Sequence, residues 1–229
     1  MNRIILSEKP HFVIQGEGVH TNKKMILLRV FGCPLRCINC DSQQTWTEKN
    51  KEYSIKEFYK MIKILTKEYN TDHILLTGGE PGLYISFMKE FFETYQDDNE
   101  WLWDIETAGV HSWEALYKWN DYIQFNFSPK IGALVAGNDM ELKAFDKLPY
   151  NFIIKVVTSK KTFEEDLRDI LRFQAGFKIN NKYIYLMPKG IDTPTIIEES
   201  KWLIEKIGEL PYNFSTRQHI LLYGNKKLV

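Results

Sequence analysis

The sequence has few cysteines, no excess of either charge and no long apolar run. Its 229 residues include only three cysteines, and thirty basic residues balance thirty acidic ones. Balanced charge argues against a nucleic-acid groove or an anionic membrane as the main partner. Residues 1–10 lack the apolar stretch of a signal peptide, and no run reaches transmembrane length. We therefore expect a cytoplasmic protein without nucleic-acid or membrane partners.

The three cysteines, Cys33, Cys37 and Cys40, stand close together in the chain. An internal disulfide framework fails, because three is an odd number and the spacing is tight. A structural zinc site needs four ligands, and the fourth would have to be one of five scattered histidines. Three closely spaced thiolates can instead hold three irons of a four-iron cluster and leave the fourth iron open. The triplet therefore favours cluster-based catalysis, with zinc as the alternative.

Short apolar runs alternate with helical patterns along the whole chain. The candidate strands are 25–31, 73–76, 102–105, 123–127, 152–157 and 183–186. The candidate helices are 54–69, with Ser54 as N-cap, 87–95, 113–119, 162–174, with a Thr162–Glu165 capping box, and 195–207. The aromatic stretch from Trp101 to Trp103 is expected in the core. This alternation predicts an α/β fold built on parallel strands.

Polar loops with glycine or proline follow successive candidate strands. They are the cysteine loop and residues 77–81, 106–109, 128–130, 158–159 and 188–190. Any one of them alone is an ordinary turn, but in parallel α/β barrels this edge carries the active site. Six such units predict a partial (β/α)6 barrel with its active site at the C-terminal ends of the strands.

Two motifs together resemble those of radical S-adenosylmethionine (SAM) enzymes. One is the cysteine triplet, and the other is Gly78-Gly79-Glu80, which follows the next candidate strand. The resemblance implies a 4Fe-4S cluster on the cysteines and SAM on its open iron. It places SAM near Asn39, Cys40, Asp41, Gly79, Ser128, Pro129 and Lys130. A solvated surface lysine is the alternative for Lys130.

The segment before the cysteines narrows this resemblance. Gln15-Gly16-Glu17-Gly18, Arg29 to Cys33 and Cys40-Asp41-Ser42, together with Ser128-Pro129-Lys130, resemble the 7-carboxy-7-deazaguanine synthase family. That family converts 6-carboxy-5,6,7,8-tetrahydropterin to 7-carboxy-7-deazaguanine with loss of ammonia, in queuosine biosynthesis. The resemblance implies a Mg²⁺ dependence, a homodimer and an external reductant such as flavodoxin or ferredoxin.

The same resemblance proposes which residues contact the substrate. They are Ile14, Gln15, Gly16, Glu17, Arg29, Thr77 and Val229. Gln15 and Glu17 can pair with the guanidine-like edge of the pterin, and Arg29 can clamp its carboxylate unless it pairs with a neighbouring acid. Ser42 is expected to bind Mg²⁺, the alternative being a turn serine. Gln218 and His219 can close the pocket.

Three positions depart from the family pattern. Asn39 replaces an aromatic residue and puts the usual adenine packing in doubt, Ser42 replaces a threonine but keeps a hydroxyl, and Ala108 replaces a polar residue. We expect one domain, with an N-terminal substrate-binding segment over 1–24, a barrel core over 25–190, and a C-terminal helix and tail over 191–229.

Two other functions share part of this pattern. A different radical SAM enzyme, such as a glycyl-radical activase, would have the same cysteine and glycine motifs. The Gln15–Gly18 motif and the lack of a cysteine-rich insert favour a small-molecule enzyme instead. A non-catalytic iron–sulfur or zinc module would need a fourth cysteine, and the sequence has none.

Overall fold

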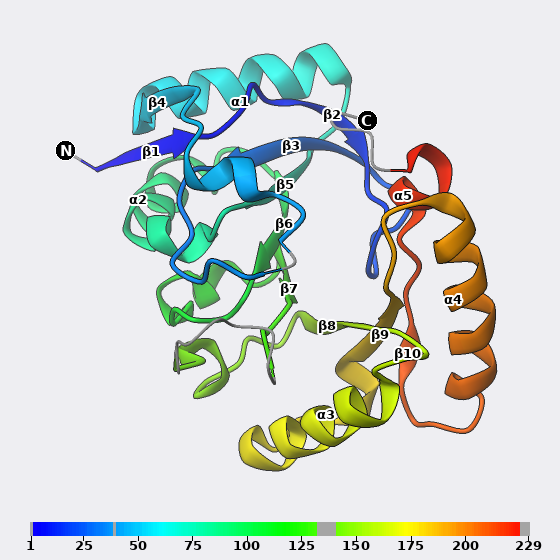
Figure 1. Ribbon diagram of the computed structural model, residues 1–229. Helices are drawn as coiled ribbons and strands as arrows, with labels where there is room; N and C mark the ends of the chain where they lie inside the picture. The colour runs from blue at the N-terminus through cyan, green and yellow to red at the C-terminus, as the bar shows by residue number, and fades with distance from the viewer. Residues whose placement is uncertain (1, 39, 132–140, 225–229) are drawn as a thin grey trace.

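A curved, mostly parallel β-sheet organises the molecule (Figure 1). The computed structural model describes residues 2–38, 40–131 and 141–224. The strands are β1 (Arg3–Leu6), β2 (His11–Ile14), β3 (Lys24–Val30), β4 (Lys51–Ser54), β5 (His73–Gly78), β6 (Leu102–Thr107), β7 (Ile123–Phe127), β8 (Phe152–Thr158), β9 (Ile184–Pro188) and β10 (Asn213–Phe214). The helices are α1 (Ile55–Tyr69), α2 (Ile85–Tyr95), α3 (Phe163–Phe177), α4 (Thr193–Ile207) and α5 (Gln218–Tyr223). Within these described ranges, no helix is long and apolar enough to cross a bilayer.

The strand order confirms the predicted α/β fold. From β3 through β5, β6, β7, β8 and β9 to β10, each strand pairs in parallel with the next. The antiparallel strands β1, β2 and β4 gather at the β3 end of this series. The sheet curves like part of a barrel, with the larger helices on its outer side (Figure 1). The carboxyl ends of the parallel strands therefore share one edge.

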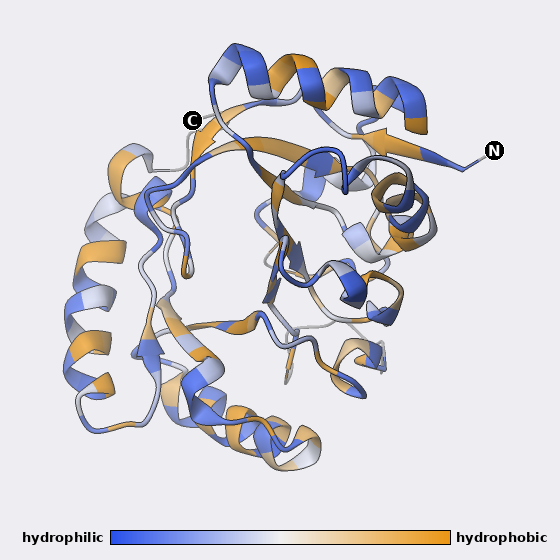
Figure 2. Cartoon of the chain, turned by 180° about the vertical axis from the view of Figure 1, so that it is seen from behind, coloured by the Kyte–Doolittle hydropathy of each residue, from blue (hydrophilic) through white to orange (hydrophobic). Residues whose placement is uncertain are grey.

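The two faces of this sheet differ sharply in polarity. On β6, Trp103 and Ile105 are buried in the main hydrophobic core, whereas Asp104 and Glu106 alternate with them and point to the opposite, inner face. Helices α1 and α4 complete the outer core with their apolar sides, so hydrophobic and hydrophilic residues alternate along them (Figure 2). Trp101 and Trp103 lie in this core, as predicted. The inner face is left to polar chemistry.

Local structure corrects two expectations. Residues 113–119 do not form an α-helix; a 3₁₀ helix runs over Glu114–Trp119. The capping box at Thr162 is also wrong, because its hydroxyl donates to Asp166 Oδ2 at 2.7 Å instead of accepting from the backbone. The N-cap at Ser54 is confirmed, and Glu57 completes a capping box there.

Candidate active site

The cysteine loop begins directly after β3, at the carboxyl edge of the sheet. Cys33, Cys37 and Cys40 are free thiols, each partly buried. Leu35, with Ala108 and Val110 from the loop after β6, forms a small apolar cluster against which Cys33 and Cys37 pack. Burial raises the pKa of the Cys33 and Cys40 thiols. The loop thus presents three thiols in an apolar setting.

These thiols fit an iron–sulfur cluster better than a single metal ion. Among the described residues, no three His, Cys, Asp or Glu side chains converge on one point that could hold an ion. A four-iron cluster does not need such convergence, because each cysteine binds a different iron. Cys37 still lies near enough to act electrostatically on both Cys33 and Cys40.

The glycine-rich loop after β5 packs directly against the cysteine loop. Gly79 N donates to Val30 O at 2.9 Å, and Glu80 N donates to Gly32 O at 2.7 Å. A Cβ at Gly79 would lie 1.8 Å from Gly32 O, so only glycine fits there. The close approach therefore locks the two loops together.

Glu80 fastens the glycine-rich loop to the loop after β6. Its carboxylate is 1% exposed and accepts from Thr107 Oγ1 at 2.5 Å, Gly82 N at 2.8 Å and Ala108 N at 2.9 Å. Burial raises its pKa although these donors favour the charged form. Because Ala108 contributes its backbone N–H, this bond does not require a polar side chain at position 108.

A pocket opens at the carboxyl end of β7, between β8 and α3. It is lined in part by Ser128, Pro129 and Lys130, and by Asp166 and Asp169 of α3. Lys130 acts electrostatically on Cys40 and favours its thiolate. The Ser128–Lys130 segment is therefore near the cysteine loop, as a SAM-binding role requires.

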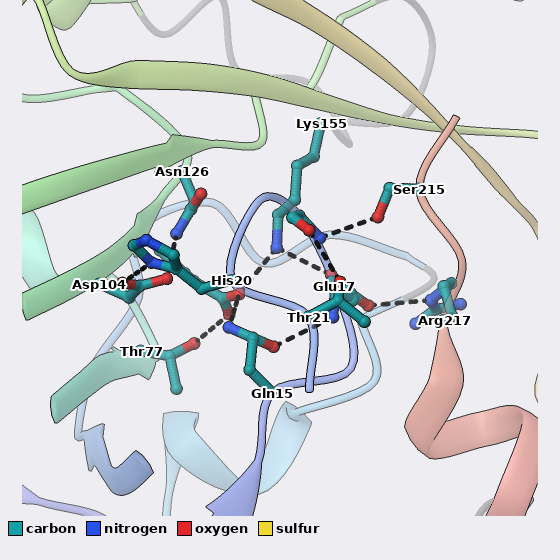
Figure 3. A network of polar contacts seen from close by, with 12 residues as sticks. Gln15, Glu17, His20, Thr21, Thr77, Asp104, Asn126, Lys155, Ser215 and Arg217 are labelled. Carbon is teal, nitrogen blue, oxygen red and sulfur yellow. Dashed lines mark hydrogen bonds and ion pairs between the residues drawn. The ribbon is translucent and has the colours of Figure 1, made fainter. Parts of the chain in front are cut away.

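A buried charge network occupies the inner face of the sheet (Figure 3). The ammonium of Lys155, on β8, lies 2.8 Å from Glu17 Oε2 and 2.7 Å from Glu106 Oε1. Thr77 Oγ1 donates to Glu106 Oε2 at 3.0 Å, and Gln15 Nε2 approaches Glu106 Oε1 at 3.5 Å. Four elements thus bring polar groups to one place: the loop after β2, and strands β5, β6 and β8.

Lys155 and Glu17 of this network stay ionised at neutral pH. Burial disfavours the charged form of Lys155, but Glu106 and Glu17 outweigh burial and raise its pKa. Burial likewise disfavours the Glu17 carboxylate, but Lys155, Arg217 and His219 outweigh burial and hold its pKa well below the usual range. The Glu17 carboxylate therefore remains an ionised hydrogen-bond acceptor in a largely buried site.

Arg217 joins the C-terminal segment to this site. Its Nε donates to Glu17 Oε1 at 3.2 Å, its Nη1 to Gly190 O at 3.0 Å and its Nη2 to Asp41 Oδ2 at 3.3 Å. The segment also bonds the N-terminal loop through its backbone, because Gln218 N donates to Gly16 O at 2.9 Å. One side chain thus connects the loop after β2 with the cysteine loop.

Comparisons with known proteins identify the fold and the family. Residues 27–134 match the radical SAM superfamily. A 7-carboxy-7-deazaguanine synthase from Buchnera aphidicola subsp. Schizaphis graminum is 30% identical over 178 residues, covering 65% of this chain and 76% of that protein. The chain belongs to the 7-carboxy-7-deazaguanine synthase family. It is a radical SAM enzyme, and its family implies a 4Fe-4S cluster and SAM as cofactors.

Other relatives span almost the whole chain. The 7-carboxy-7-deazaguanine synthase of Bacillus cereus is 24% identical over 239 residues, covering 93% of this chain and 94% of that protein. The crystal structure of QueE from Escherichia coli shares the fold with a TM-score of 0.73 at 20% identity, covering 95% of both chains.

In this synthase, the side chains of Arg29 and Ser42 are hydrogen-bonded to each other. Arg29 Nε donates to Glu8 Oε1 and its Nη1 to Ser42 Oγ, both at 3.1 Å. Ser42 Oγ in turn donates to Asp41 Oδ1 at 2.9 Å. The ion pair with a neighbouring acid, considered as the alternative for Arg29, is thus present, and it leaves Arg29 Nη1 directed at the expected Mg²⁺ ligand.

The remaining predicted residues differ in placement. Gln15, Gly16, Glu17 and Thr77 meet at the charge network or its edge. Ile14 is 46% exposed on β2, outside that network. His219 Nε2 lies 3.8 Å from Glu17 Oε1, at the charge network, and its closing of the substrate pocket stays a prediction. Asn39 and Val229 lie outside the described residues.

Sequence reasoning missed Glu106, Lys155 and Arg217 as site residues. Lys155 carried a signal, because a lysine inside the apolar run 152–157 has to find a buried partner. Glu106 was placed in a polar loop at the correct edge but was given no role. Nothing local marks Arg217, since its partners come from distant segments.

Proposed function

We propose that the charge network of the synthase binds 6-carboxy-5,6,7,8-tetrahydropterin for its conversion to 7-carboxy-7-deazaguanine with loss of ammonia. The observation that carries this proposal is the pair of carboxylates, Glu17 and Glu106, held on either side of Lys155. The guanidine-like edge of a pterin offers several N–H donors, and ionised carboxylates are acceptors only. Thr77 and the Gln15 amide add a hydroxyl and an amide group beside them.

Arg29 supplies the complementary charge for the carboxylate of the substrate through its terminal N–H groups, although its Nε already pairs with Glu8. A guanidinium binds carboxylates through paired N–H donors, and Arg29 is only partly exposed, which limits competition from water. The pterin would then lie between an acceptor-rich end at Glu17 and Glu106 and a cationic end at Arg29. Such two-ended recognition fixes the ring in one orientation, which radical chemistry requires for hydrogen transfer at one position.

SAM and the cluster would lie on the carboxyl side of this site. Cys33, Cys37 and Cys40 would hold the cluster, and the pocket at Ser128–Lys130 would take part of SAM. When bound, the reduced cluster and SAM supply a carbon-centred radical that removes a hydrogen atom from the substrate. The protein's own work is to orient the pterin and exclude water. The backbone around Gly79, which is hydrogen-bonded to the cysteine loop, would hold SAM and the cluster in a fixed position relative to each other.

The carboxylate role of Arg29 has a direct test. In anaerobically reconstituted enzyme, Arg29→Ala should weaken carboxypterin binding by roughly 1.5–3 kcal/mol, the range for hydrogen bonds to charged groups. SAM binding should change little, because the hydrogen bond of the Arg29 side chain to the described part of the cysteine loop goes to Ser42. Titration of each ligand by calorimetry measures both. Equal losses for the two ligands, or none, would contradict the assigned role, and a parent enzyme that forms no deazaguanine would contradict the substrate itself.

We also propose Ser42 as the protein ligand of Mg²⁺. A lone hydroxyl holds this hard cation weakly, so substrate oxygens have to complete the site. Ser42→Ala should remove most of the Mg²⁺ stimulation of turnover and leave the iron content intact, whereas Ser42→Thr should keep the stimulation. Turnover measured over a Mg²⁺ titration, with Thr45→Ser as a nearby hydroxyl-preserving control, decides the matter. An alanine variant that responds to Mg²⁺ like the parent enzyme would exclude Ser42.

Several further assignments remain predictions. They are the flavodoxin- or ferredoxin-type reductant, the homodimer, the cytoplasmic location, the absence of nucleic-acid and membrane partners, and the three-part division of the chain at 24 and 190. The SAM contacts of Asn39, Cys40 and Asp41 and the substrate contacts of Ile14 and Val229 belong to the same group. The wider proposal does not depend on them, because it rests on the network around Lys155.

A further inference from the structure

A second polar cluster lies on the inner face of the sheet, away from the cysteine loop. Asp104 precedes Glu106 by two residues on β6, so the two carboxylates share a face. Asp104 Oδ1 lies 2.7 Å from His20 Nδ1, and Asp104 Oδ2 accepts from Asn126 Nδ2 at 3.2 Å. Figure 3 shows these three side chains directed at one another. None of them has a role in the proposed recognition of the pterin.

His20 belongs to the same loop as the proposed substrate contacts Gln15 and Glu17. We call residues 15–23 the recognition loop. Its internal bonds tie its two ends together, since Gln15 N donates to Lys23 O and Asn22 N to Gln15 O, both at 2.8 Å. At its centre, Gly18 N donates to Ser215 Oγ at 2.8 Å. Two charged side chains of this loop contact the sheet. Glu17 pairs with Lys155 on β8, and His20 pairs with Asp104 on β6.

The burial of Asp104 makes this contact strong. Asp104 is 2% exposed, and a buried carboxylate is costly unless it is paired and hydrogen-bonded. His20 supplies the partner from the loop, and Asn126 supplies a second donor from β7. Withdrawing His20 would leave the carboxylate without its cationic partner. The sheet therefore holds the loop in place through a group that the loop itself has to satisfy.

We propose that His20 and Asp104 are positioning residues that hold the recognition loop so that Gln15 and Glu17 face the pterin. This inference rests on the proposed function for its consequence in catalysis, but not for the contact itself. His20 would act through the loop backbone, because its carbonyl accepts from Lys23 N at 3.0 Å and closes the turn that ends the loop. Neither residue is assigned contact with substrate, SAM or the cluster.

The charges around His20 give this contact a pH dependence. Asp104 faces His20 directly, and the positive charge of Lys23 opposes that of His20. The ring of His73 lies edge-on to the His20 ring, with 5.6 Å between their centroids. Asp72 Oδ1 lies 3.9 Å from His73 Nε2. The hydrogen bond that His20 donates to Asp104 raises the pKa of His20, against the effect of burial. The charged contact is therefore complete below the ordinary histidine value of 6.5 and is lost as the pH rises through the higher folded value.

The experiment compares His20→Ala and His20→Gln with the parent enzyme, all loaded with cluster. His20→Ala should raise the KM for carboxypterin about tenfold, as for one lost charged hydrogen bond, with little change in kcat or in SAM binding. His20→Gln keeps an N–H donor and should recover part of the loss. The rise of pterin KM with pH in the parent should be absent from both variants. His11→Ala is the matched control, because His11 lies on β2, outside the recognition loop, and its side chain hydrogen-bonds the Lys9 carbonyl.

Hydrogen exchange tests the contact without any pterin. Backbone amides of Gly18, Asn22 and Lys23 should exchange faster in His20→Ala than in the parent, while amides of α1 stay protected. An unchanged pterin KM, or unchanged exchange in this loop, would overturn the proposal. A uniform loss of protection across the fold in His20→Gln would overturn it as well, because that marks a scaffold role only. If the parent fails to use carboxypterin but the loop still loosens in the variant, only the proposed function falls.

Discussion

Replacing Cys37 with alanine should abolish SAM cleavage. Anaerobically reconstituted parent enzyme should hold about four irons per chain on three cysteines, each thiolate binding a different iron. Cys37 is the central member, since it acts electrostatically on both Cys33 and Cys40. Its loss should reduce iron content and remove 5′-deoxyadenosine formation entirely. Iron analysis and chromatography of the nucleoside products measure the two effects.

The same substitution should leave the fold intact. Cys37 is only partly buried and lies in a loop beside the small cluster of Leu35, Ala108 and Val110 rather than in the main core. The thermal unfolding of apo Cys37→Ala should match that of apo parent protein. Stoichiometric zinc without iron in the parent, or full SAM cleavage by the variant, would refute the cluster assignment.

Replacing Lys155 with methionine should have the largest effect on stability. Lys155 is buried between Glu17 and Glu106, and removing one partner of a buried ion pair costs roughly 3–5 kcal/mol. Carboxypterin binding should be lost together with the network. Denaturant unfolding gives the free energy, and calorimetry gives the binding.

An exposed ion pair of the same length provides the control. Lys147 Nζ lies 2.8 Å from Glu114 Oε2 with 65% of the lysine side chain exposed, so Lys147→Met should cost only about 0–1 kcal/mol. The destabilisation of Lys155→Met should also shrink in acid. Glu17 has a lowered pKa in the parent, so the stability that it contributes is present above its ordinary value of 4.5 and fades as the pH falls below it. Equal costs for the two lysines would refute the buried network.

Strong apolar runs made the parallel strands predictable. The run 123–127 matches β7 residue for residue. The ends of the other five predicted strands differ from the observed ends by at most two residues. The antiparallel strands were missed for physical reasons. β4 has one buried residue, Tyr53, among polar neighbours, and β1 is too short to show alternation. The parallel strand β10 was also missed, because it has only two residues. Their pairing depends on partners far away in the chain, which local patterns do not encode.

The site residues also divide into those that the sequence predicts and those that it does not. The cysteines, Gly79 and Gln15–Glu17 stand in contiguous motifs whose chemistry is visible in the residues themselves. Lys155 has its role only because β8 turns that side chain inward, opposite Glu106 of a strand two places away in the sheet. Arg217 depends on a loop meeting a segment that the sequence separates widely. The roles of Lys155 and Arg217 follow from strand register and long-range contacts, which local sequence patterns do not show.

The separation between Glu17 and Arg217 also orders the folding of the enzyme. The two residues are 200 positions apart, and the Gly18–Ser215 bond spans 197. Contacts so distant carry a large loop-closure cost and form late, whereas the cysteine loop packs against the loops after β5 and β6, which lie much closer to it in the sequence. We therefore expect the cysteine loop to fold before the recognition loop forms its bonds with Ser215 and Arg217. A folding chain passes through a stage in which its cluster site is assembled and still reachable, and the substrate side closes over it afterwards.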